Sequence, residues 1–177
     1  MEDSIENNNI FHISGEPYRK VAFEVNKNPK YKDLSADQYR RGAKNSDNDP
    51  TRIERQGKLG ELAWAFLTNQ IEQFQIKETY RKYDFIEPNT KKKIDVKTTE
   101  LSDRFLIKTD LGINADIYPV FRVISDDTEN HEIVFEALGY FTKEDIDPNL
   151  TQKGKGDWLN YVIPRSKFKP IDDFIVD

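Results

Sequence analysis

The chain has 177 residues, a formal net charge of −5 and no cysteine. That length suits one domain with a full hydrophobic core. With 33% charged and 12% aromatic residues, the composition is typical of a soluble globular protein. The lack of cysteine excludes disulfides and thiolate metal sites. With only two histidines, a histidine-based zinc centre is not expected either.

No apolar run approaches the roughly 20 residues needed to cross a bilayer. The acidic, polar opening MEDSIENNNIF is unlike a signal peptide. We therefore expect a cytoplasmic protein without a membrane partner, forming a single domain over residues 1–177 with a loose N-terminal arm at about 1–16. The negative net charge argues against a simple nucleic-acid coat, but Lys and Arg concentrate locally in residues 27–58.

In chain order, the first element expected is a short strand at YRKVAFEV (18–25). LSADQYRRGAKN (34–45) begins with a capping-box pattern, which predicts a helix. Asp49-Pro50 offers an N-cap followed by a first-turn proline, so a second helix is expected from there to about Asn69.

The second helix carries the apolar stripe of a packed helix, formed by Leu59, Leu62, Ala63, Phe66 and Leu67. Trp64 and Ala65 lie off the stripe, which predicts packing on more than one side. Strand-like runs follow at 74–79, 82–87, 92–99, 115–124, 132–141 and 158–164, with one helical turn at 143–146. One long helix followed by strands predicts an α/β domain with a central mixed β-sheet flanked by helices.

The segment YDFIEPNTKKKIDVKT predicts two strands around a turn at 88–91. Centring the pairing on that turn places Phe85 opposite Ile94 and Tyr83 opposite Val96. These four apolar side chains then share one face, as a core face requires.

On the other face of this hairpin, Asp84 is expected directly opposite Asp95, with Lys97 two residues further along. Like charges directly opposite one another destabilise a sheet. A divalent cation between them would turn repulsion into attraction, and Mg²⁺ takes one or two carboxylates plus water and phosphate oxygens. An isolated Asp-x-Lys is usually a solvated strand face, but the opposing aspartate and the preceding helical Glu61 favour a functional site.

The order of these residues resembles the PD-(D/E)xK nuclease superfamily, which has the restriction-endonuclease-like fold. That family has a helix with a glutamate, then a hairpin with an aspartate and a (D/E)-x-K tripeptide. The matching residues are Glu61 in GKLGELAWAFL, Asp84 in YDF, and Asp95 and Lys97 in IDVKT. Tyr83 stands where the family usually has proline. The resemblance covers residues 57–99 and, more loosely, the strands to about 141.

The resemblance implies a Mg²⁺-dependent deoxyribonuclease, with Mn²⁺ as a substitute metal. It implies that Asp84 and Asp95 bind the metal together with the Val96 carbonyl, that Glu61 is a further ligand, and that Lys97 positions the attacking water. In such enzymes the metal polarises the phosphate, helps to generate hydroxide and neutralises the leaving oxygen. RecB-like exonucleases usually have a Gln-rich motif after the lysine, and its absence here favours a restriction-, phage- or resolvase-like endonuclease.

Two groups of basic residues are candidate DNA contacts: Arg52, Arg55 and Lys58 on the helix, and Lys91, Lys92 and Lys93 at the hairpin tip. A solvated helix face and an ordinary basic turn explain them as well. The alternative function is a non-cleaving nuclease-fold module that binds DNA or a protein, and the negative charge also allows a DNA mimic. The resemblance further implies a possible homodimer, because cutting both strands needs two sites.

Overall fold

The computed structural model describes residues 9–28, 51–76, 82–109, 113–153 and 159–174. Within these ranges the helices are α1 (Glu16–Lys27) and α3 (Arg52–Leu67), and the 3-10 turns are η1 (Ile71–Gln73), η3 (Lys143–Asp145), η4 (Arg165–Lys167) and η5 (Ile171–Phe174). The helix expected at 34–45 lies outside the described residues. In the described part of the chain, no helix is long and apolar enough to cross a membrane.

The main sheet is mixed, and β6 is at its centre. Along β6, β7 is antiparallel on one side, and β3 and β4 are parallel on the other. The strands, from one edge to the other, are β1 (Ile10–Ser14), β7 (Glu132–Thr142), β6 (Ile117–Asp127), β3 (Lys93–Ile94) and β2 (Phe85–Ile86), with β4 (Lys97–Thr99) also on β6. The predicted α/β class with a mixed sheet is therefore confirmed.

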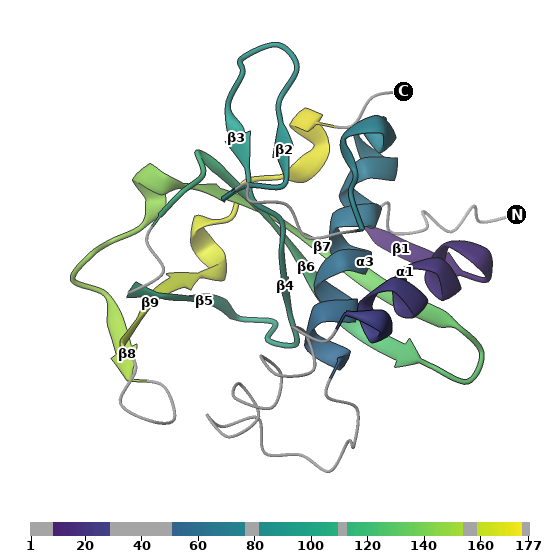
Figure 1. Ribbon diagram of the computed structural model, residues 1–177. Coiled ribbons are helices and arrows are strands. Elements are labelled where there is room, and N and C mark those ends of the chain that lie inside the picture. Colours follow the sequence, from purple (N-terminus) through teal and green to yellow (C-terminus); the bar gives the residue numbers. More distant parts are fainter. Residues whose placement is uncertain (1–8, 29–50, 77–81, 110–112, 154–158, 175–177) are drawn as a thin grey trace, which may run out of the picture.

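A second, three-stranded antiparallel sheet contains β5 (Arg104–Lys108), β9 (Leu159–Pro164) and β8 (Thr151–Lys153). Figure 1 shows α1 and α3 on one side of the main sheet and this second sheet on the other. Each side has its own apolar core. The sheet was expected to be flanked by helices, and in the described part of the chain α1 and α3 both lie on the same side of the main sheet.

Two N-terminal expectations are wrong. The arm expected at about 1–16 contains β1, which pairs with β7. The strand expected at 18–25 lies within α1, because Tyr18, Val21 and Val25 are buried at helical spacing while Phe23 is 60% exposed. The period-2 pattern required Phe23 to point inward.

Helix α3 forms within the predicted limits and packs on more than one side, as expected. Trp64 and Ala65 are fully buried, whereas Phe66 of the predicted stripe is 55% exposed. Gly60 lets a strand approach closely: a Cβ at this position would lie 2.4 Å from the Thr98 Cγ2 atom of β4. The close contact between α3 and β4 therefore depends on a residue without a side chain.

Candidate active site

Helix α3 passes β4 (Figure 1), and the four predicted site residues lie close enough to interact electrostatically. Glu61 comes from the middle of α3, and Asp84 directly precedes β2. Asp95 lies in the break between β3 and β4, and Lys97 begins β4. These strands keep the same register with β6 on both sides of the break. The carboxylates of Glu61, Asp84 and Asp95 are called the carboxylate cluster below.

The hairpin forms with the predicted register, since Phe85 pairs with Ile94 and Ile86 with Lys93. The regular pairing stops there. The backbone N–H of Asp84 donates to the Ile94 carbonyl at 2.8 Å. The expected Asp84–Asp95 and Tyr83–Val96 pairs are therefore not part of the ladder. Beyond this backbone bond, Asp84 contacts the segment that follows β3 through its side chain.

Asp84 is held by a hydrogen bond to the neighbouring strand break. The Val96 N–H donates to its Oδ2 atom at 2.8 Å. Burial raises the pKa of Asp84 to about 8, the negative charges of Glu61 and Asp95 add to the shift, and the Val96 hydrogen bond opposes it. All three members of the carboxylate cluster thus lie within electrostatic reach of one another, although the fold gains nothing from that repulsion.

The other two carboxylates each have a lysine. Lys58 Nζ lies 2.7 Å from Glu61 Oε2, and Lys97 Nζ lies 2.6 Å from Asp95 Oδ2. Burial raises the pKa of Glu61, and the charge of Lys58 is the largest influence that lowers it. The two ammonium groups therefore offset part of the negative charge of Glu61 and Asp95.

The donor set fits a hard divalent cation, because Mg²⁺ prefers carboxylate oxygens and water. The pKa of half-buried Asp84, raised to about 8, means that its surroundings do not fully compensate a negative charge there. The geometry is not that of a ready-made cage. Across the described ranges, no three acidic or histidine side chains are placed to hold a metal ion as they stand. A cation at Glu61 or Asp95 would compete with the lysine that already contacts one oxygen of that carboxylate.

The basic residues of α3 have three different environments. Arg52 pairs with Glu100, and Lys58 belongs to the candidate site. Arg55 is only 4% exposed, and its guanidinium contacts Asp126 Oδ2 at 2.8 Å. The expectation that Arg55 contacts DNA phosphates is therefore wrong, since its charge is already used inside the protein.

Asp126 on β6 is the residue that sequence reasoning missed. It accepts hydrogen bonds from Tyr18 of α1 and from Arg55 and Gln56 of α3. This buried network ties both helices to the sheet. Its partners are far apart in the sequence, and no local pattern connects them.

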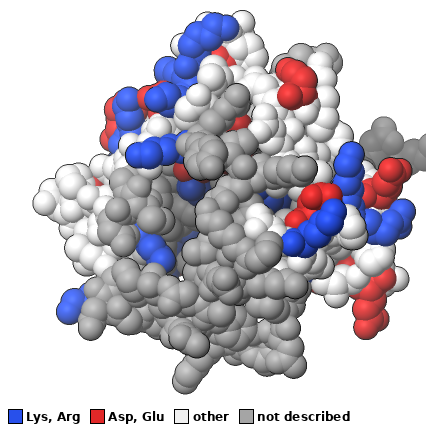
Figure 2. All heavy atoms as spheres, in the orientation of Figure 1, with Lys and Arg blue, Asp and Glu red and all other residues white. Residues whose placement is uncertain are grey.

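Lys91, Lys92 and Lys93 are exposed on the β2–β3 hairpin. The hairpin projects from the sheet in Figure 1, and Figure 2 shows basic side chains gathered on the same part of the molecule. Lys91 Nζ contacts the Pro88 carbonyl, and Lys93 Nζ lies 5.5 Å from the centre of the Tyr83 ring. All three remain candidate phosphate contacts.

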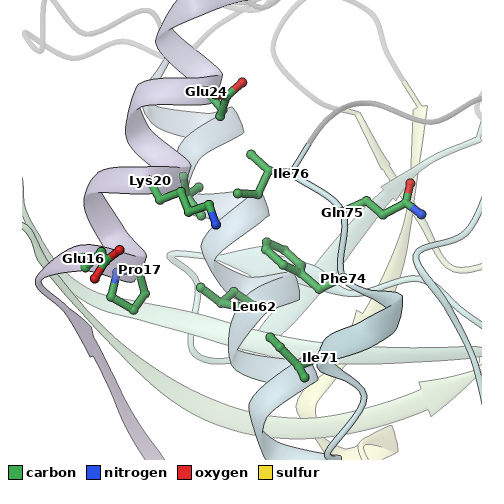
Figure 3. A pocket seen from close by; sticks show the side chains of 10 residues that line it. Glu16, Pro17, Lys20, Glu24, Leu62, Ile71, Phe74, Gln75 and Ile76 are labelled. Carbon is green, nitrogen blue, oxygen red and sulfur yellow. The ribbon is translucent and has the colours of Figure 1, made fainter.

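A separate cavity of about 730 Å³ lies between α1 and α3. Figure 3 shows Leu62, Ile71, Phe74 and Ile76 around it, with the polar groups of Glu16, Lys20, Glu24 and Gln75 at its edge. No member of the carboxylate cluster lines this cavity. It is therefore distinct from the candidate active site.

Comparisons of the chain with protein-family models, with curated proteins and with solved structures found no match.

Proposed function

We propose that this protein is a Mg²⁺-dependent deoxyribonuclease with a restriction-endonuclease-like fold, and that it acts as an endonuclease. The observation that carries the proposal is the meeting of Glu61, Asp84, Asp95 and Lys97 at one point of the fold, in electrostatic contact. These residues come from three separate parts of the chain. A fold that needed only stability would not place three carboxylates together.

Asp84 and Asp95 are the proposed metal ligands, with Glu61 and the Val96 carbonyl as further ligands. When bound, Mg²⁺ or Mn²⁺ would supply Lewis-acid activation of the water and of the phosphate. The Val96 N–H holds the Asp84 carboxylate in place before any cation arrives. Such pre-positioning reduces the reorganisation that binding requires.

Lys97 is ion-paired with Asp95, so its ammonium is a hydrogen-bond donor. It is suited to orient the attacking water and to stabilise negative charge on the phosphate, rather than to accept a proton. In the hydrolysis, the water oxygen forms a bond to phosphorus and the bond from phosphorus to the leaving sugar oxygen breaks. Solvent takes one proton from the attacking water and supplies one to the leaving oxygen, which becomes a hydroxyl. Lys91, Lys92 and Lys93 would contact the DNA backbone beside the site.

The experiment is a cleavage assay on supercoiled plasmid, linear duplex, single-stranded and branched DNA, each with Mg²⁺ or Mn²⁺. Asp95→Ala and Lys97→Ala serve as matched variants. We expect metal-dependent nicks in plasmid that both variants fail to make. If the wild type leaves every substrate intact with both metals, the protein is not this nuclease. Cutting of branched DNA alone would favour a resolvase over a restriction enzyme.

A second candidate is a non-cleaving module of the same fold that binds DNA or a protein. The lysine contacts of Glu61 and Asp95 favour it, because they already neutralise two of the three carboxylates without a metal. This candidate predicts DNA binding that chelators leave unchanged. The nuclease predicts cleavage that chelators abolish.

A further inference from the structure

Lys58 lies inside the candidate site rather than on the outer face of α3. Its Nζ is 2.7 Å from Glu61 Oε2, and the two side chains are 17% and 14% exposed. Its charge also acts on Asp84, which belongs to a different part of the chain. Lys58 therefore interacts with Glu61 and Asp84, two of the carboxylates that are proposed to bind the cation.

The charges of the site set up a competition. Among the described residues, Lys58 pairs with Glu61 and Lys97 pairs with Asp95, while the Asp84 carboxyl is held by the Val96 N–H. A hard cation at Glu61 would compete with Lys58, because both are attracted to the same carboxylate. Once displaced, the ammonium remains beside the metal site, where a DNA phosphate would lie.

We propose that Lys58 competes with the divalent cation for Glu61. When the cation is bound, the Lys58 ammonium leaves Glu61 and forms an ion pair with a phosphate of the DNA. This inference rests on the proposed function for the identity of both ligands. It makes Lys58 a residue that couples the two binding events. Metal binding would free a phosphate contact, and DNA binding would remove the competitor of the metal.

The test uses Lys58→Met. Loss of the competing charge should tighten Mg²⁺ binding to the DNA-free protein about tenfold, as measured by isothermal titration calorimetry with MgCl₂. The same variant should bind DNA several-fold more weakly, because a phosphate contact is lost. DNA affinity is measured by fluorescence anisotropy of a labelled short duplex, with Ca²⁺ as the cation.

Two controls separate the inference from simpler roles. Lys92→Met, at the exposed hairpin tip, should weaken DNA binding but leave Mg²⁺ affinity unchanged. In a Glu61→Gln background, Lys58→Met should no longer tighten Mg²⁺ binding, because the contested carboxylate is gone. Lys58→Gln removes the charge but keeps a donor for Glu61, and it gives the same prediction if the methionine variant fails to fold.

Unchanged or weaker Mg²⁺ binding by Lys58→Met or Lys58→Gln, in a protein with wild-type circular dichroism, would overturn the inference. Tighter Mg²⁺ binding with unchanged DNA affinity would overturn the transfer to phosphate. If the wild type, Lys58→Met and Lys58→Gln all fail to bind Mg²⁺, the proposed function itself fails. That result differs from a failure of the Lys58 inference alone, in which the wild type still binds the metal.

Discussion

The backbone N–H of Val96, in the break between β3 and β4, donates a hydrogen bond to the carboxylate of Asp84, which directly precedes β2. This bond holds a buried carboxylate next to two others, which costs the folded protein stability. The same arrangement suits a site that receives a cation. Stability and proposed function should therefore respond in opposite directions to changes at Asp84.

Asp84→Asn should stabilise the metal-free protein and abolish cleavage. The amide keeps an acceptor for the Val96 N–H but removes the buried charge. Because the folded-state pKa of Asp84 is about 8 against an ordinary 3.8, we expect a gain on the order of 2–4 kcal/mol at pH 7. Urea denaturation measures it. Mg²⁺ should raise the melting temperature of the wild type and have little effect on the variant.

The pH dependence of that gain follows from the raised pKa of Asp84. Below pH 3.8 the carboxyl is protonated in both the folded and unfolded chains, so the substitution should change little. As pH rises toward 8, the unfolded chain ionises first and the wild type loses stability. The difference between wild type and Asp84→Asn should widen over this window and level off above it. A difference that stays constant from pH 4 to pH 8 would contradict the burial of this charge.

Two glycines of α3 predict opposite results for the same substitution. Gly60→Ala places a methyl group against Thr98 and should destabilise the protein by about 1–3 kcal/mol. A Cβ added at Gly57 would meet no neighbouring atom within 4 Å, so Gly57→Ala should gain up to about 1 kcal/mol from helix propensity. Thermal denaturation of the two variants compares them directly. Equal effects would mean that α3 and β4 do not pack as described.

Asp126→Ala tests the structural role of Arg55. Removal of the carboxylate takes the Asp126 ion pair away from a buried guanidinium, and this should cost about 3–5 kcal/mol. The control is Glu100→Ala, which removes the partner of the more exposed Arg52 and should cost less than about 1 kcal/mol. Denaturant unfolding measures both. Comparable small losses would restore Arg55 as a candidate DNA contact.

The hairpin register was predictable because alternation of apolar and polar residues fixes which residues face the core. Phe85 and Ile94 pair as expected. The irregularity at Asp84 was not predictable, since no turn signal or glycine marks it. The side chain nevertheless reaches Asp95 electrostatically. The residues of the candidate site could thus be predicted from the sequence, whereas the contacts between them could be seen only in the structure.

Helix α1 was predicted as a strand because its apolar residues fit both the two-residue repeat of a strand and the 3.6-residue repeat of a helix. Val21, Phe23 and Val25 alternate as in a strand, while Tyr18, Val21 and Val25 lie on one side of a helix. Only tertiary packing, which buries the second set, distinguishes them. The burial of Arg55 has a similar origin, since its partner Asp126 is 71 positions away. The ion pair of Lys58 and Glu61, by contrast, could be predicted once the helix was predicted, because residues at i and i+3 are neighbours on a helix surface.

The proposed nuclease activity is tested most directly by nicking of supercoiled plasmid with wild type and Asp95→Asn, purified side by side and matched by circular dichroism. Asp95→Asn keeps the size of the side chain but removes one proposed metal ligand and the partner of Lys97. We expect Mg²⁺-dependent nicking by the wild type and a loss of at least about 100-fold in the variant. Equal nicking by both proteins, or none by the wild type in Mg²⁺ or Mn²⁺, would contradict it.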